Sequence, residues 1–279
     1  MTPQHLATRQ RDVPFDAADL WKERIGGFRR SVVPWLDDEQ ALAGSHVLEL
    51  GSGSGASTAA LAEQGAQVVG LDLAVDDLAT ARSCLAQMGL AADLRQRNAN
   101  DLADLADEGF DRIIYWAVLE HMTINERLSS LESAWEVLGS GGLLTVVETP
   151  NRLWPFDSHT SVLPYFSWLP YELAYRYSVK SERSTFNNVY TDDHYTHMDS
   201  YLRRGHGVSF HEFDLAIGDH RELVVGPSMQ EFWRSRSQVR RHGWALSQWG
   251  RCKRSLSSFS PATPRAWLQP FLYLSIRKS

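Results

Sequence analysis

Apolar residues between positions 46 and 150 fall into short runs that alternate with stretches of helical spacing. The short runs predict buried strands at residues 46–50, 67–73, 94–98, 111–116 and 143–148. Helical spacing predicts helices at residues 16–42, 57–65, 76–88 and 125–138. Strands that alternate with helices predict an α/β domain with a parallel sheet, covered on both faces.

The pattern changes after residue 150. Residues 151–195 are predicted to be irregular, because prolines at 150, 155, 164 and 170 break any long element. A short helix is predicted at 198–204, and two late strands at 208–213 and 271–276.

Charge and aromatic content divide the chain at the same place. Residues 1–150 hold 11 basic and 23 acidic residues, whereas residues 151–279 hold 17 basic and 11 acidic ones. The first part has 8 aromatic residues and the second has 22. This indicates an α/β frame followed by an aromatic, basic region that meets the substrate. An aromatic core in the second part is an equally direct explanation, and the two are compatible.

Composition excludes several classes of protein. The 279 residues are 43% hydrophobic and 22% charged, which is typical of a globular protein and excludes a mainly disordered chain. Two cysteines do not make a disulfide framework and fit a reducing compartment. The N-terminus has no apolar signal core, and no apolar run approaches a membrane span. We therefore expect a cytoplasmic protein.

A glycine-rich loop joins the first strand to the next helix. Gly51, Gly53 and Gly55 follow residues 46–50 directly, and glycine lets the backbone turn sharply against a ligand. The second strand leads to Asp72, 21 residues after Gly51. An acid at that position accepts hydrogen bonds from ribose hydroxyls. Loop and acid together predict an adenosine-containing cofactor at the carboxyl ends of the strands.

The glycine spacing differs from the G-x-G-x-x-G of nicotinamide enzymes. The chain resembles the class I methyltransferases that use S-adenosylmethionine (SAM), and within them the ubiquinone-type O-methyltransferases, over about residues 30–152. The matching motifs are Glu49 before Gly51-x-Gly53-x-Gly55, then Val118-Leu119-Glu120-His121, Gly141-Gly142 and Glu148-Thr149-Pro150-Asn151-Arg152. The resemblance implies a Rossmann-like fold with a seven-stranded, mostly parallel sheet and an inserted aromatic cap after the fifth strand.

The resemblance also implies the cofactor contacts, with S-adenosylhomocysteine as the product. The glycines would wrap the methionine and ribose, Asp72 would bind the ribose, and Leu73 would lie on the adenine. The remaining contacts would come from Glu49 as the motif acid, Asn98, Ala99 and Asn100 beside the adenine, Trp116 near the sulfonium, and Arg29 or Arg30 at the carboxylate. Alternatively, Trp116 is a core residue, and Arg29 and Arg30 are solvated residues on a helix surface.

A hydroxyl acceptor must lose its proton, and histidine titrates in the right range for this task. His121 follows the fourth strand and His159 follows the fifth, so either is a candidate base. The alternatives are that His121 orients its loop and that His159 is a surface residue. Some relatives hold a metal through Glu, Glu and His, but Ala117 stands at the first of these positions. The His194-x-x-His197 and His211-Glu212 spacings are weak signals, so no metal is predicted.

Two segments of the second part remain. The aromatic residues of 151–195 predict a lid or cap that forms an apolar acceptor pocket, or else a helical insertion packed on the sheet edge. Residues 234–254 are basic and contain Trp244 and Trp249, a combination typical of nucleic-acid or anionic-membrane contact. The net charge of −6 argues against nucleic acid, and a solvated helix face is the common alternative.

We therefore predict a single methyltransferase domain over residues 1–279. It divides into an N-terminal helical lid (1–45), a SAM-binding core (46–150), the cap (151–200), and terminal strands with a basic helical insertion (201–279). It would methylate a hydroxyl of a small aromatic or lipid-like molecule. N-methylation of a small molecule and a non-catalytic SAM-binding role are the alternatives, and the glycine spacing disfavours a nicotinamide reductase.

Overall fold

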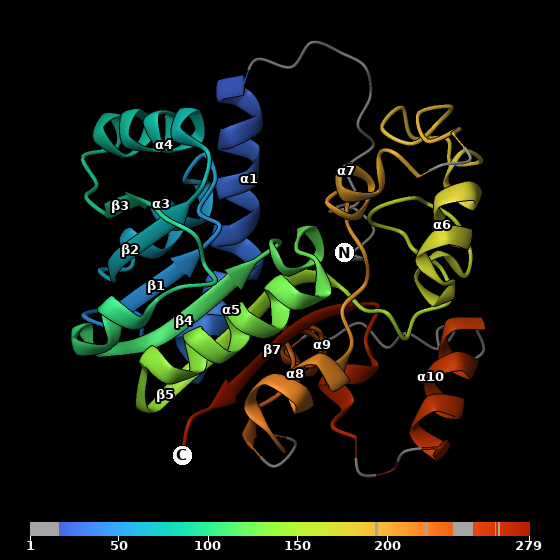
Figure 1. Ribbon diagram of the computed structural model, residues 1–279. Helices are drawn as coiled ribbons and strands as arrows, with labels where there is room; N and C mark the ends of the chain where they lie inside the picture. Colours follow the sequence, from blue (N-terminus) through green and yellow to red (C-terminus); the bar gives the residue numbers. More distant parts are fainter. Residues whose placement is uncertain (1–16, 193–194, 221–222, 237–247, 260, 262) are drawn as a thin grey trace. The chain divides into compact units, whose positions relative to one another are not determined.

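A computed structural model of the protein describes residues 17–192, 195–220, 223–236, 248–259, 261 and 263–279 (Figure 1). The chain divides into two compact units. The first unit comprises residues 1–116, 132–145 and 277–279, and the second comprises residues 117–131 and 146–276. No helix in the described residues is both long and apolar enough to cross a membrane.

The sheet has seven strands in the order β3-β2-β1-β4-β5-β7-β6. The strands are β1 (His46–Leu50), β2 (Gln67–Asp72), β3 (Asp93–Gln96), β4 (Phe110–Trp116), β5 (Leu138–Pro150), β6 (Val224–Val225) and β7 (Phe271–Arg277). β1 pairs in parallel with β2 and β4, whereas β6 and β7 are antiparallel. The predicted Rossmann-like, seven-stranded and mostly parallel sheet is confirmed.

The strand order reverses between β1 and β4. The chain runs outward from β1 through β2 to β3, and then returns to place β4 on the other side of β1. Ligands of open α/β sheets bind at the carboxyl ends of strands at such a reversal. Both strands are mostly apolar and mostly buried, as the runs 46–50 and 111–116 predicted, because strands inside a parallel sheet are covered on both faces.

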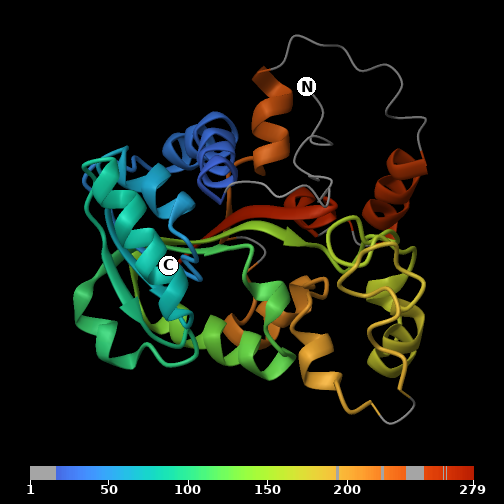
Figure 2. The ribbon, with the colours of Figure 1, turned by 90° about the horizontal axis from the view of Figure 1, so that it is seen from above.

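The helices agree with the predicted segments in the first part of the chain. They are α1 (Ala17–Ser31), α2 (Val33–Glu39), α3 (Ala56–Ala62), α4 (Val75–Gln87), α5 (Ile124–Val137), α6 (Tyr171–Ser178), α7 (Met198–Leu202), α8 (Phe210–Ile217), α9 (Met229–Arg236) and α10 (Gln248–Phe259). The predicted helix 16–42 is two helices, because Pro34, in the first turn of α2, lacks the N–H that a continuous helix would need there. α1 packs against α3 (Figures 1 and 2).

The predictions for the second part were less accurate. The predicted strand 208–213 is wrong: Val208 makes one isolated bridge to Asn151, and α8 starts at Phe210. The reason is a capping box, in which Ser209 and Glu212 satisfy each other's backbone N–H groups. The predicted irregular segment 151–195 contains α6, which Pro170 starts rather than breaks.

The aromatic residues of the second unit pack on one another. Phe166, Tyr175, Phe186 and Tyr201 are at most 1% exposed and form one cluster with their neighbours. Tyr201 lies within 5.1 Å of Tyr175, between ring centroids. The aromatic residues therefore supply a core to this segment, which was one of the two explanations that the composition allowed.

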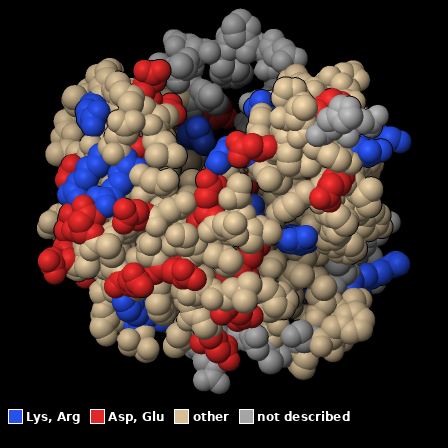
Figure 3. All heavy atoms as spheres, viewed as in Figure 1, with Lys and Arg blue, Asp and Glu red and all other residues tan. Residues whose placement is uncertain are grey.

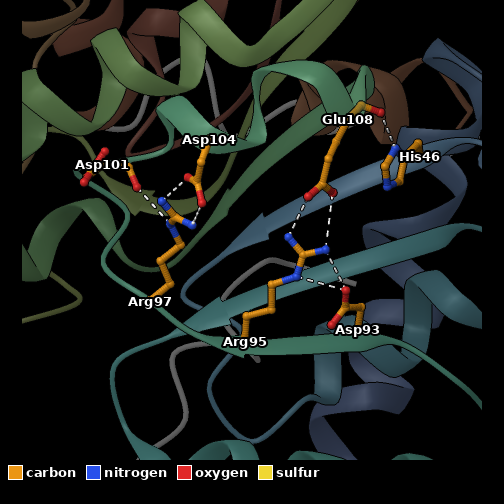
Figure 4. Close-up of polar contacts among 7 residues, drawn as sticks. All are labelled: His46, Asp93, Arg95, Arg97, Asp101, Asp104 and Glu108. Atoms are coloured by element: carbon orange, nitrogen blue, oxygen red, sulfur yellow. Dashed lines mark hydrogen bonds and ion pairs between the residues drawn. The ribbon is translucent and has the colours of Figure 1, made fainter.

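An ion pair joins the edge strand β3 to Glu108, which lies just before β4 (Figure 4). Arg95 bridges Asp93 at 2.6 Å and Glu108 at 2.7 Å, and the carbonyl of Glu108 lies 3.0 Å from Nδ1 of His46. Basic and acidic side chains accordingly lie beside one another on this face of the molecule (Figure 3). The ion pairs are partly solvated, so each contributes at most about 1 kcal/mol to stability.

Candidate functional site

The glycine loop is hydrogen-bonded to the end of β2. The N–H groups of Gly51 and Ser52 both donate to the carbonyl of Leu71, at 2.9 and 3.0 Å. The N–H of Gly53 donates to Oδ2 of Asp72 at 2.7 Å. A Cβ at Gly53 would meet no atom within 4 Å, so the backbone here borders open space. The loop is therefore held in place and accessible to a ligand.

Gly55 lets the helices beside the loop approach closely. It caps α3 in the left-handed conformation, with φ of 82°. A Cβ at this position would lie 2.7 Å from Cβ of Ala81 in α4. Both the backbone angle and the contact require glycine, which explains the third glycine of the motif.

Asp72 has acceptor capacity beyond the contacts that position it. Its Oδ2 accepts from Gly53, and its Oδ1 accepts from the N–H of Ala74 at 2.8 Å. A carboxylate offers about four lone-pair sites, so these two bonds leave about two for a ligand. The side chain is half-buried, at the carboxyl end of β2. The residue thus fits a ribose, whose two hydroxyls need two acceptors.

Glu49 lies beneath the loop and is fully buried. Its Oε2 accepts a hydrogen bond of 2.5 Å from Oγ1 of Thr58. Burial raises its pKa to about 7, although hydrogen bonds from Ser57 and Thr58 oppose that rise. Glu49 therefore connects β1 to the first turn of α3. Its predicted direct role at the cofactor stays a prediction.

An exposed apolar surface follows Asp72. Leu73 is 63% exposed and Val75 is 55% exposed, which is unusual for large apolar side chains. On the next loop Asn98 is exposed and Ala99 is buried, and the N–H of Asn100 donates to Oδ1 of Asn98 at 3.0 Å. This arrangement fits the flat face and edge of an adenine ring.

The loop that carries Asn98 is braced by an arginine. Arg97 donates through Nε to the carbonyl of Asp101 at 2.9 Å and through Nη1 to Oδ2 of Asp104 at 2.6 Å (Figure 4). Oγ of Ser133 donates to the carbonyl of Asn100 at 3.1 Å. These bonds, together with that from Asn100 to Oδ1 of Asn98, fix the loop.

The two arginines of α1 differ in their surroundings. Arg29 donates through Nε to Oε2 of Glu63 at 2.7 Å, so it is already paired. Arg30 is exposed, and its Nη1 lies 3.2 Å from where a Cβ on Gly26 would stand. Arg30 is therefore the better candidate of the two for a ligand carboxylate.

Two of the tryptophans of the first unit, Trp116 and Trp21, bear on the predicted site. Trp116 is 5% exposed and packs on Phe28, with 4.4 Å between ring centroids. Its packing is that of a core residue, and its predicted place near a sulfonium stays a prediction. Trp21 was not predicted as a site residue, yet its Nε1 donates to the carbonyl of Ser54 in the glycine loop at 2.9 Å. Its helical spacing indicated only an apolar face.

The two candidate bases lie in the second unit. His121 is exposed, and its Nδ1 lies 3.0 Å from the carbonyl of Arg203, which selects the tautomer with the proton on Nδ1. Its Nε2 is then a proton acceptor. His159 is half-buried, with its ring edge-on to Phe271 at 5.9 Å. No contact joins the two histidines within the described part of the chain.

A histidine that the sequence did not single out lines a cavity of about 110 Å³ in the second unit. His206 is 5% exposed and stacks on Phe166 at 5.3 Å. Burial, with Arg127 and Arg152 nearby, lowers its pKa to about 3, so the ring is neutral. Among the described residues its Nε2 has no hydrogen-bond partner. The cavity is lined by Met122, Thr123, Ile124, Asn125, Arg127, Tyr171, Leu202 and His206.

The weak metal spacings lead to no cluster. Among the described residues no group of three or more His, Cys, Asp or Glu side chains is arranged to hold a metal ion. His194 lies outside the described residues, as do residues 1–16 of the predicted lid and residues 237–247 of the basic stretch.

Residues 47–142 match a protein-family model described as a methyltransferase domain. The ubiquinone biosynthesis O-methyltransferase of Stutzerimonas stutzeri is 40% identical over 90 residues, which are 32% of this chain and 39% of that protein. The enzyme of the same name from Pseudomonas aeruginosa is 38% identical over 120 residues, 43% of this chain and 50% of that protein. A solved magnesium protoporphyrin IX methyltransferase from Synechocystis, with bound S-adenosylhomocysteine, is 21% identical at a TM-score of 0.41, covering 51% of this chain and 64% of that one.

These findings confirm the predicted resemblance. Residues 47–142 are similar to a methyltransferase domain, and the strand order of the sheet to which they contribute is Rossmann-like. The matched region spans 39 to 50% of the length of these two O-methyltransferases.

Proposed function

We propose that the protein is a SAM-dependent methyltransferase that methylates a hydroxyl of a small aromatic or lipid-like molecule. The observation that carries this proposal is the glycine loop fastened to Asp72, whose carboxylate keeps acceptor sites for a ribose. The methyltransferase domain at residues 47–142 supports the reaction class. The names of the O-methyltransferases that the chain resembles support oxygen as the methylated atom.

The residues of the first unit would bind the cofactor. Gly51, Gly53 and the loop backbone would hold the methionine and ribose, and Leu73 would cover the adenine. Arg30 would pair with the cofactor carboxylate, and Trp21 would join α1 to the loop as part of an N-terminal lid over residues 1–45. Residues 46–150 are then the cofactor core, 151–200 the cap and 201–279 the terminal region.

The second unit would bind the acceptor. The cavity of about 110 Å³ is smaller than an engineered cavity of about 150 Å³ that binds benzene, so it would take only one edge of an acceptor ring. The neutral Nε2 of His206 would form a hydrogen bond with a ring hydroxyl. With a pKa of about 3, His206 is too weak a base to take the proton at neutral pH. His121, with Nε2 as an acceptor, is the better candidate base, and His159 is the second.

Bound SAM supplies an activated methyl group, so the chain's own residues need only position the acceptor and accept its proton. We expect SAM and S-adenosylhomocysteine to raise the thermal midpoint of the protein, and NADH to leave it unchanged. A ligand at 100 times its dissociation constant adds about 2.7 kcal/mol to the free energy of unfolding. A shift with NADH alone, or with none of the three, would contradict the proposal.

Replacing His206 with leucine tests the acceptor pocket. Leucine removes the hydrogen bond, worth about 1 kcal/mol, so KM for a phenolic acceptor should rise about five- to tenfold while SAM affinity stays unchanged. Steady-state kinetics with a panel of phenols and catechols measures this. The matched control is His211→Leu, which alters an exposed histidine. An equal KM in both variants would place the acceptor elsewhere.

A further inference from the structure

A second cavity of the second unit, of about 360 Å³, gathers positive charge. It lies among α9, α10 and the 3-10 turn η7 (Arg265–Leu268). Its lining residues are Glu231, Arg234, Gly250, Lys253, Arg254, Ser257 and Arg265. Four cationic side chains thus border the cavity, against one carboxylate.

The carboxylate of Glu231 already accepts hydrogen bonds at the start of α9. Oε2 of Glu231 accepts hydrogen bonds from Oγ of Ser228 at 3.0 Å and from its N–H at 3.3 Å. The lining of the cavity therefore holds four cationic side chains and one carboxylate, which already accepts two hydrogen bonds from Ser228.

The positive charges of the cavity also affect one another, as the surroundings of Lys253 show. Its Nζ is buried and has no hydrogen-bond partner among the described residues. Burial lowers the pKa of Lys253, Glu231 raises it, and Arg234 and Arg265 lower it further. A buried ammonium without a partner costs free energy, and nearby guanidinium groups add repulsion. An anion in the cavity would remove both costs.

We propose that this cavity binds a phosphate-type anion, either a diphosphate or a phosphate ester. One guanidinium group donates two parallel hydrogen bonds to two oxygens of a phosphate, and a lysine adds a compact positive charge. The lining therefore suits a multiply charged oxyanion better than a single carboxylate. The volume of about 360 Å³ is within the range of small-molecule sites. The phosphate belongs either to a free phosphorylated metabolite or to an anionic lipid headgroup. None of the lining residues takes part in the proposed cofactor or acceptor sites.

The test is calorimetric titration of the full-length protein with inorganic pyrophosphate at low salt. We expect measurable binding, and a loss of at least about tenfold in affinity for Lys253→Met and for Arg265→Gln. Methionine keeps the packing of the lysine stem and removes an unpartnered buried charge, so that variant should retain its fold. The matched control is Arg251→Gln, which removes an exposed charge from α10 outside the cavity and should bind normally.

Flotation with phosphatidylglycerol and phosphatidylcholine vesicles identifies the source of the phosphate. Pyrophosphate binding without vesicle binding supports a free phosphorylated ligand. Binding to phosphatidylglycerol vesicles that pyrophosphate inhibits and Lys253→Met weakens supports a lipid headgroup. No pyrophosphate binding, or equal losses in the Lys253, Arg265 and Arg251 variants, would overturn the proposal. The SAM-induced thermal shift is measured separately, so either proposal can fail alone.

Discussion

Replacing Asp72 with asparagine should weaken SAM binding about 100-fold. The carboxylate now accepts two backbone hydrogen bonds, from Gly53 and Ala74, and has acceptor sites left for the ribose. An amide has one acceptor oxygen, and its NH₂ group would face a backbone N–H. The variant therefore loses both the fixed loop and charge-assisted bonds to the ribose. A loss of about 3 kcal/mol, from one to two such bonds, corresponds to about two orders of magnitude in affinity.

Calorimetric titration with SAM and with S-adenosylhomocysteine measures this loss. The matched control is Asp77→Asn, which makes the same change in charge at an exposed position in the first turn of α4. That variant should bind both ligands normally. A near-normal affinity in the Asp72 variant would contradict the assignment of the cofactor site.

The cofactor loop was predictable because its signals are local. A short apolar run, three closely spaced glycines and an acid after the next strand need no knowledge of distant segments. The structure adds the reasons: Gly53 donates to Asp72, and Gly55 allows the contact with Ala81. The same alternation of strands and helices predicted the parallel pairing of β1 with β2 and β4, whereas the strand order comes from the structure.

The acceptor side was less predictable because its contacts join distant residues. The carbonyl that orients His121 belongs to Arg203, 82 residues later. His206 has no motif of its own, and its position in the cavity wall depends on ring contacts with Phe166, Tyr171 and Tyr201. Residues 208–213 have a strand-like composition, yet the Ser209–Glu212 capping box starts a helix there. The strand propensity of a segment predicts its structure poorly where tertiary contacts and helix caps determine whether it forms a strand or a helix.

Replacing Glu49 with glutamine should remove a large pH dependence of stability. Burial raises the pKa of Glu49 to about 7 from an ordinary value of 4.5, so the folded protein holds this proton where the unfolded chain has released it. The stability that this proton contributes is fully present below about pH 4.5 and is lost as pH rises through 7. The shift corresponds to about 3 kcal/mol. Glutamine keeps an acceptor for Thr58 but does not titrate.

Urea denaturation of both proteins at several pH values between 4.5 and 8 measures this effect. The free energy of unfolding of the wild type, minus that of Glu49→Gln, should fall by about 3 kcal/mol over this range. The subtraction removes the titration of all other groups that the two proteins share. Glu132→Gln, an exposed change on α5, is the control and should show a much smaller dependence. A constant difference for Glu49→Gln would mean that folding leaves the pKa of Glu49 at its ordinary value, so that the carboxyl is ionised at neutral pH. Glu49 would then support the loop as a buried anion bonded to Thr58, rather than as a neutral acid.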